Sequence, residues 1–152
     1  MSEGVHIVRL IPVVDLETGE ALEIDQETIY KTVTERNGIV LKCTNGKSYR
    51  FPRNQDELED AWFHTGFRRL DSTNVVNMNH TRVYDEKAGK IYFEDPPTKN
   101  SDFGNVAAIH SDYVIFEVSK EFGVKIIPAR SELSIKMKSR SYVPRHNIAP
   151  QS

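Results

Sequence analysis

The sequence predicts a mostly β fold of antiparallel sheets with one short helix, followed by a C-terminal extension. Two Asn-Gly dipeptides, Asn37-Gly38 and Asn45-Gly46, separate short segments that are rich in β-branched residues. Asn-Gly readily forms two-residue hairpin turns, so these segments are expected to form an antiparallel meander. The clearest helical spacing of apolar residues lies in residues 54–66, where Gly66 ends the pattern.

The N-terminal half is predicted to consist of strands joined by tight turns. Residues 5–25 contain two short extended pieces on either side of Thr18-Gly19. The meander strands are expected at residues 28–35, 39–44 and 47–51, and the short helix follows them. Acidic residues in the first turn of that helix favour its dipole.

The second half predicts fewer regular elements. Residues 81–95 indicate a strand, a turn containing Gly89 and a second strand, and residues 96–104 indicate a loop. Residues 106–118 have the composition of a strand, yet Ala107, Ala108 and the Ser-Asp pair after them are typical of a helix start, so both alternatives stay open. Residues 124–138 are expected to add an extended piece before a frayed end.

Length, charge and cysteine content limit the class of protein. The 152 residues suit one domain, and no apolar run is long enough for a membrane span. The start of the chain lacks the pattern of a signal peptide. The single cysteine, Cys43, cannot form an internal disulfide, so we expect a reducing, cytoplasmic setting and a structural thiol.

The charge is distributed unevenly, although the net charge is only −2. Residues 119–152 carry seven basic and two acidic side chains, whereas the first 118 residues carry 13 basic and 20 acidic ones. Lys136, Lys138 and Arg140 alternate with other residues, as on a strand with one basic face. Such a face contacts DNA phosphates, or it protects an edge strand from aggregation, and charge alone does not separate the two.

Known catalytic patterns are missing from the sequence. The five histidines lie at no metal-ligand spacing with the cysteine, and there is no phosphate-binding loop, dinucleotide-binding motif or nucleophile elbow. We therefore expect no enzyme activity, no cofactor and no metal site.

The most informative segment is GFRRLDSTNVVN, residues 66–77. It contains a phenylalanine, an arginine two residues later, a polar cluster, and an apolar pair closed by an asparagine. This order, with the paired strands and helix before it and the hairpin after it, resembles the LytTR family of bacterial DNA-binding domains. The resemblance covers roughly residues 20–115, so we predict a LytTR-like domain over residues 1–118 and a basic extension over 119–152.

The resemblance implies a transcriptional regulator whose loops enter the major grooves of double-stranded DNA. It places DNA contacts in the first hairpin, in the polar loop before the apolar pair, and after the last strand. The residues implied are Arg36 and Asn37 in the first region, Arg69, Asp71 and Ser72 in the second, and His110 and Ser111 in the third. We add Lys136, Lys138 and Arg140 of the basic extension as phosphate contacts.

Two features favour a different function. Asp71 and Ser72 stand where LytTR domains commonly carry a histidine and a basic residue, and Asp112 stands where arginines are typical. Together with the net charge of −7 over residues 1–118, they favour a protein-interaction module that keeps the fold. An enzyme of unknown type is a third, weaker alternative.

The resemblance also bears on regulation. LytTR domains commonly occupy direct repeats, so self-association on repeated sites is expected. Fewer than 25 residues precede the resemblance, so we expect no receiver domain before it. Control would then come from a regulatory protein partner, a small signal or abundance.

Overall fold

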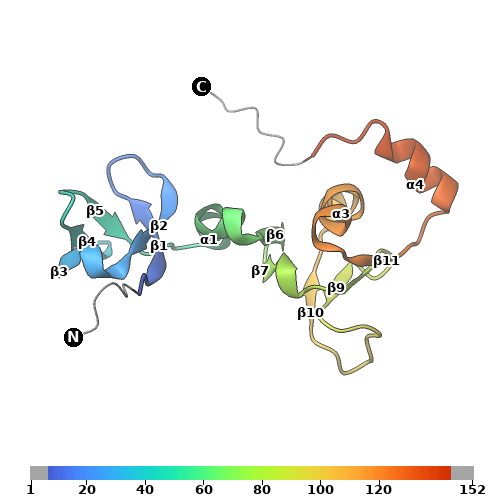
Figure 1. Ribbon diagram of the computed structural model, residues 1–152, viewed down its shortest axis with the longest axis horizontal. Coiled ribbons are helices and arrows are strands. Elements are labelled where there is room, and N and C mark those ends of the chain that lie inside the picture. Colours follow the sequence, from blue (N-terminus) through green and yellow to red (C-terminus); the bar gives the residue numbers. More distant parts are fainter. Residues whose placement is uncertain (1–6, 145–152) are drawn as a thin grey trace. The chain divides into compact units, whose positions relative to one another are not determined.

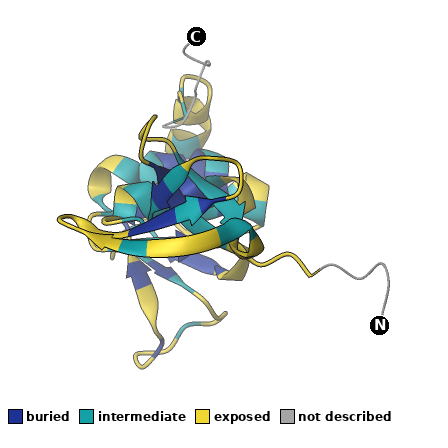
Figure 2. Ribbon diagram, turned by 90° about the vertical axis from the view of Figure 1, so that its left-hand side faces the viewer, coloured by how far each residue is buried: buried dark blue, intermediate teal, exposed yellow. Residues whose placement is uncertain are grey.

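The computed structural model describes residues 7–144, which form two compact units (Figure 1). Unit 1 comprises the described residues up to Gly66, and unit 2 comprises those from Phe67 onward. The predicted mostly β fold with antiparallel sheets and short helices is confirmed at this coarse level. Figure 2 shows the buried residues in dark blue on strands and helical turns, and the exposed residues in yellow.

Unit 1 is built on a five-stranded antiparallel sheet with the order β2-β1-β5-β4-β3. Its strands are β1 (Leu10–Asp15), β2 (Ala21–Asp25), β3 (Ile29–Glu35), β4 (Gly38–Cys43) and β5 (Ser48–Arg50). A 3₁₀ turn, Gln26–Thr28, leads from β2 into β3. The Thr18-Gly19 turn and both Asn-Gly turns connect successive strands, so the predicted meander is confirmed.

The core of unit 1 is small. Val13, Leu41, Cys43 and Tyr49 are each at most 3% exposed, and partly buried apolar side chains of β1, β2 and β3 pack around them. Cys43 is a free, buried thiol, as the sequence predicted.

Helix α1 (Gln55–Trp62) confirms the predicted helix, and two polar contacts hold its first turn. The Asn54 side chain accepts a hydrogen bond from the Glu57 amide at 2.9 Å, which satisfies a free donor of the first turn. The Glu57 carboxylate accepts two hydrogen bonds from the Arg50 guanidinium, at 2.8 and 2.7 Å, and so ties the helix start to β5. A 3₁₀ turn, Phe63–Thr65, then ends at Gly66, whose φ is 101°.

Unit 2 contains a hairpin and a mixed sheet. The hairpin pairs β6 (Phe67–Asp71) with β7 (Asn74–Asn77). The sheet has the order β10-β9-β8-β11, with β8 (Val83–Asp85), β9 (Lys90–Tyr92), β10 (Phe103–Asn105) and β11 (Lys125–Ile127). A 3₁₀ turn, Met78–His80, joins the two. The predicted hairpin in residues 81–95 is confirmed, and β11 adds to β8 in the parallel sense.

Residues 108–122 form one helical run, so of the strand and the helix that the sequence left open here, the structure has the helix. It comprises a 3₁₀ turn (Ala108–His110), α2 (Ser111–Tyr113), a π-helical stretch (Val114–Val118) and α3 (Ser119–Phe122). Because its apolar residues are contiguous, their pattern fits a buried strand and a buried helix equally well. In the structure the segment is helical, and its apolar residues lie in the core of unit 2.

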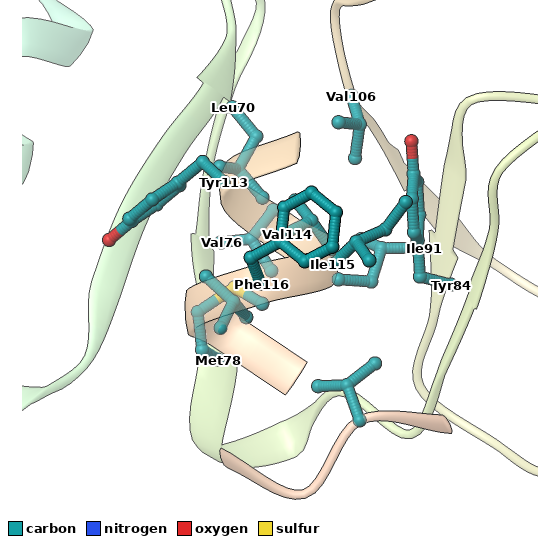
Figure 3. Close-up of a cluster of buried hydrophobic side chains, with 12 residues drawn as sticks. Leu70, Val76, Met78, Tyr84, Ile91, Val106, Tyr113, Val114, Ile115 and Phe116 are labelled. Carbon is teal, nitrogen blue, oxygen red and sulfur yellow. The ribbon is translucent and has the colours of Figure 1, made fainter. Parts of the chain in front are cut away.

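The core of unit 2 forms around this helical run (Figure 3). Tyr113 and Phe116 lie among side chains of the β6–β7 hairpin and of β8 and β9. The buried cluster comprises Leu70, Val76, Met78, Tyr84, Ile91, Val106, Tyr113, Val114, Ile115, Phe116, Val118 and Val124. Leu70 and Val76 of the 66–77 segment are thus core residues.

The C-terminal segment differs in part from its prediction. An extended piece is predicted over residues 124–138, and β11 confirms its start, but α4 (Glu132–Ser139) is a helix, capped by the Ser131 side chain. Strand alternation would place Ile135 and Met137 on one face, whereas Ile135 packs against the core and Met137 is 65% exposed. Within residues 7–144 the chain therefore has more than the one helix predicted.

The described part of unit 2 also extends past the boundary expected at Val118. Strand β11 pairs with β8, and Val124 belongs to the buried cluster. Residues 119–127 are thus packed together with the strands that precede them. In the described range, no helix combines the length and the apolar character that crossing a membrane requires.

Truncation of Leu70 tests the core of unit 2. Leu70 is 0% exposed, so Leu70→Ala is expected to lower the free energy of unfolding by about 2 to 5 kcal/mol through lost burial and a residual cavity. Leu133→Ala is the matched control, because Leu133 is 67% exposed, and its effect should stay within about 0.5 kcal/mol. Urea unfolding followed by far-UV circular dichroism measures both, and equal effects would contradict this core.

The Arg50–Glu57 ion pair predicts a pH-dependent stability of unit 1. The hydrogen bonds from Arg50 lower the pKa of Glu57 from 4.5 to about 2. The pair therefore stabilises the fold fully above pH 4.5, and this contribution is lost as the pH falls towards the pKa of about 2. Glu57→Gln should reduce stability at neutral pH, and its difference from the parent chain should shrink on acidification. Urea unfolding followed by Trp62 fluorescence measures this, since Trp62 is the single tryptophan.

The control for this prediction is Glu20→Gln, which makes the same chemical change at an exposed position of unit 1. It should show little pH-dependent difference from the parent chain. A Glu57→Gln difference that stays constant from neutral pH to about pH 2 would contradict a stabilising role for the ionised pair.

Candidate nucleic-acid interface

The first predicted contact region is the turn between β3 and β4. Glu35 pairs with Gly38, so Arg36 and Asn37 form the two-residue tip, and both are exposed. A small groove of about 130 Å³ lies beside the tip, and its lining includes Arg36, Arg50 and Arg53. The hairpin therefore presents a hydrogen-bonding amide and a guanidinium next to further positive charge.

The charges of this groove are partly balanced. Arg50 is neutralised by Glu57, whose low pKa keeps its carboxylate ionised at neutral pH. The Arg53 backbone N–H also donates to Glu57, at 2.9 Å, while the Arg53 residue is exposed. Arg36 and Arg53 are thus the two cations that a phosphate group can reach most readily. The sequence prediction included Arg36 but missed Arg53, because their proximity depends on strand pairing.

The second predicted region is the β6–β7 turn, where Ser72 and Thr73 form the tip. The Asp71 carboxylate accepts hydrogen bonds from the backbone N–H of Thr73 at 2.8 Å and from its hydroxyl at 2.5 Å. These hydrogen bonds lower the pKa of Asp71, and the nearby charges of Arg69 and His110 act in the same direction. Asp71 therefore organises the turn, while Ser72 is exposed at its tip.

The third predicted region lies next to the second. The Ala107 amide donates to the Leu70 carbonyl at 2.7 Å, and the Asn105 amide donates to the Asn74 side chain at 3.0 Å. The His110 amide in turn donates to the Ala107 carbonyl, at 2.8 Å. Residues far apart in sequence, from Arg69 to Ser72 and around His110, thus meet at one place on unit 2.

Ser111 has a structural contact in this region. Its hydroxyl lies 2.7 Å from the Tyr84 hydroxyl of β8, within hydrogen-bond distance. Burial raises the pKa of Tyr84, so its phenol stays protonated at neutral pH. Ser111 therefore links the start of the helical run to the sheet.

Of the three cations of the C-terminal extension that were predicted to contact phosphates, one forms an ion pair in the described part of the chain and two do not. Lys138 forms an ion pair with Asp112, with 2.8 Å between Nζ and Oδ2. Lys136 and Arg140 are exposed and form no ion pair within residues 7–144. Arg130, which the sequence prediction missed, pairs with both Glu86 and Asp112. No local motif signals that network, because its members come from β8–β9, α2 and the segment before α4.

The two units have opposite charge balances. Residues 1–66 contain 7 Lys and Arg against 12 Asp and Glu, a net charge of −5. Residues 67–152 contain 13 against 10, a net charge of +3. The positive balance of unit 2 comes from residues 119–152, with seven basic and two acidic side chains, because residues 67–118 carry 6 Lys and Arg against 8 Asp and Glu, a net charge of −2.

Comparison with known proteins adds no assignment to this geometry. Over residues 7–144, no group of three or more histidine, cysteine or acidic side chains is arranged to hold a metal ion. No protein-family model, no curated protein and no solved structure matches the chain.

Proposed function

We propose that the protein is a sequence-specific DNA-binding transcriptional regulator that contacts double-stranded DNA through its loops. The main support is the meeting of the β6–β7 turn with the segment around His110 on unit 2, whose positive charge lies in residues 119–152. The resemblance of residues 66–77 to LytTR domains, and the mostly antiparallel fold, agree with this function.

The side chains at this meeting point suit DNA. The Ser72 hydroxyl donates and accepts hydrogen bonds, the His110 imidazole does so in its neutral form, and Arg69 interacts electrostatically with the neighbouring Asp71. Such groups bind base edges and phosphate oxygens. Asp71 does not contact DNA in this proposal, because its carboxylate is occupied by Thr73.

The β3–β4 hairpin supplies a second contact region. Arg36 suits guanine or phosphate, and Asn37 suits adenine, whose major-groove edge offers one acceptor and one donor. Arg53 adds a phosphate contact from the same groove. Base-specific recognition is thus assigned to the turns, and affinity to the surrounding cations.

A protein-interaction module is the second candidate function. It is favoured by the net charge of −5 on unit 1 and by exposed apolar residues of β3 and β4, where Tyr30 is 64% and Ile39 is 50% exposed. Large exposed apolar side chains are common at sites where proteins bind one another. Selection of bound genomic DNA fragments separates the two functions.

Substitution of the hairpin tip tests sequence-specific binding. The purified protein is incubated with genomic DNA fragments at about physiological salt, and the retained fragments are sequenced. The parent chain should recover a shared motif, and Arg36→Ala with Asn37→Ala should lose it, because base-edge contacts at the tip are removed. Lys31→Ala, an exposed change on the same hairpin away from its tip, should retain the motif.

Retention of no DNA, or of DNA without a motif, would overturn the proposal in favour of the interaction module. Recovery of the same motif by the double variant would remove the hairpin from the recognition surface.

The exposed cations of α4 give a second prediction, on affinity. Each phosphate contact contributes about 0.9 to the slope of log affinity against log salt, because a condensed counterion is released. Lys136→Ala with Arg140→Ala should therefore flatten the slope by about 1.8. Lys99→Ala with Lys120→Ala removes the same charge from other exposed positions of unit 2 and should change the slope less. Fluorescence anisotropy of a labelled duplex, titrated at several salt concentrations, measures both, and equal slopes would contradict contacts at α4.

A further inference from the structure

We propose that Asp112 is a positioning residue that holds α4 on unit 2, so that the outer face of α4 forms a binding surface for the phosphate backbone of DNA. This inference rests on the proposed function and deepens it, because it names the chemical group bound and the residues that keep the surface in place.

An ion-pair network fastens the C-terminal segment to unit 2. Arg130 contacts Glu86 at 2.6 Å and Asp112 at 2.8 Å, and Lys138 contacts Asp112 at 2.8 Å. The Ala129 amide also donates to Glu86, at 2.9 Å. Glu86 is only 10% exposed and Asp112 is 25% exposed, so solvent screens these pairs less than it screens pairs on an open surface.

Asp112 is the centre of this network. Partial burial opposes its ionisation, but the hydrogen bonds from Lys138 and Arg130 prevail and lower the pKa of Asp112. It is therefore ionised at neutral pH and joins α2, the segment before α4, and α4 itself. Lys138 enters the network through its contact with Asp112.

Apolar contacts support the same attachment. Ile135 and Tyr142 pack against the core of unit 2, and the Tyr142 ring lies 5.4 Å from the Phe116 ring, centre to centre. The Arg130 guanidinium lies 5.9 Å from the centre of the Phe116 ring. Apolar and cation–aromatic contacts thus act on the C-terminal segment together with the ion pairs.

Helical geometry separates the anchoring residues from the exposed cations. Ile135 and Lys138 are three residues apart and share the inner face of α4. Lys136 and Arg140 are four residues apart, so they lie together, and their positions are turned away from that inner face. Docking by Lys138 thus leaves Lys136 and Arg140 directed away from unit 2, beside exposed Leu133 and Met137.

This arrangement explains an acidic residue next to the predicted DNA-contacting segment. A carboxylate alone at position 112 would repel phosphate, but here Glu86 and Asp112 are matched by Arg130 and Lys138. The two possible roles of Asp112 predict opposite effects. If Asp112 only repels DNA, its neutralisation raises affinity, whereas if it positions α4, neutralisation lowers affinity.

Limited proteolysis of the full chain tests the anchor without DNA. Trypsin cleaves after lysine and arginine, and a helix must open locally before it is cut. Asp112→Asn should increase the rate of cleavage after Lys136 and Arg140 by about tenfold. Asp102→Asn, which makes the same change at an exposed position of unit 2, should leave the rate unchanged. Lys138→Met breaks the same pair from the other side and should increase cleavage at these two positions as well.

A double-mutant cycle on the full chain tests the phosphate surface. From the salt dependence of two phosphate contacts, Lys136→Ala with Arg140→Ala should weaken duplex binding roughly 10- to 30-fold at physiological salt. Asp112→Asn alone should weaken binding about tenfold although it removes a negative charge. In the Asp112→Asn background, the two alanine substitutions should weaken duplex binding further by less than about twofold. The effects of residues that act through one another are not additive. Asp102→Asn should leave affinity unchanged or raise it slightly.

The outcomes separate this inference from the proposed function. If the parent chain binds no DNA, the proposed function fails, and the proteolysis result alone decides whether Asp112 anchors α4. An unchanged cleavage rate in both Asp112→Asn and Lys138→Met overturns the anchor. Faster cleavage with unchanged or higher DNA affinity overturns the phosphate surface. Faster cleavage, lower affinity and a non-additive cycle together support the inference.

Discussion

Burial of one helical run against two hairpins is the constraint on which unit 2 depends. Tyr113, Val114, Phe116 and Val118 are each at most 5% exposed, and they pack against residues of β6–β7 and β8–β9. A fully buried side chain of this size contributes about 1.5 to 3 kcal/mol, so this cluster exceeds any single polar contact of the unit. The position of the run also sets the position of His110, Ser111 and Asp112 at its start.

The candidate interface follows from that packing. The β6–β7 turn and the start of the helical run meet because Leu70 is in the core and its carbonyl accepts the Ala107 amide. Asp71 then keeps its turn closed through Thr73, and Asp112 gathers Arg130 and Lys138. In the sequence, Asp71 and Asp112 look unsuited to binding DNA. In the structure, their carboxylates form hydrogen bonds and ion pairs within unit 2. In the proposed function they shape a surface that presents exposed Ser72, half-buried His110 and the exposed cations Lys136 and Arg140.

Unit 1 has a smaller buried core than unit 2, and an ion pair with two hydrogen bonds supports it. Four residues form its buried centre, while the Arg50–Glu57 pair joins β5 to the start of α1. The same pair leaves Arg53 and Arg36 as the cations beside the exposed hairpin tip. The stability and the candidate contact region of unit 1 are therefore linked through Glu57.

The sequence by itself determined the elements whose signals are local. The Asn-Gly turns, the capped helix after Asn54 and the hairpin around Gly89 each depend on neighbouring residues, so residue type and spacing predict them. Only the tertiary structure decided that residues 108–122 are helical, that α4 replaces a strand, and that Asp112 meets Arg130 and Lys138. An unbroken apolar run fits strand and helix equally, and an ion pair between distant residues leaves no periodic pattern. The helical run is buried against partners distant in sequence, which no local pattern encodes. Helix α4 has no buried residue and contacts the rest of unit 2 through Ile135 and the Lys138–Asp112 ion pair.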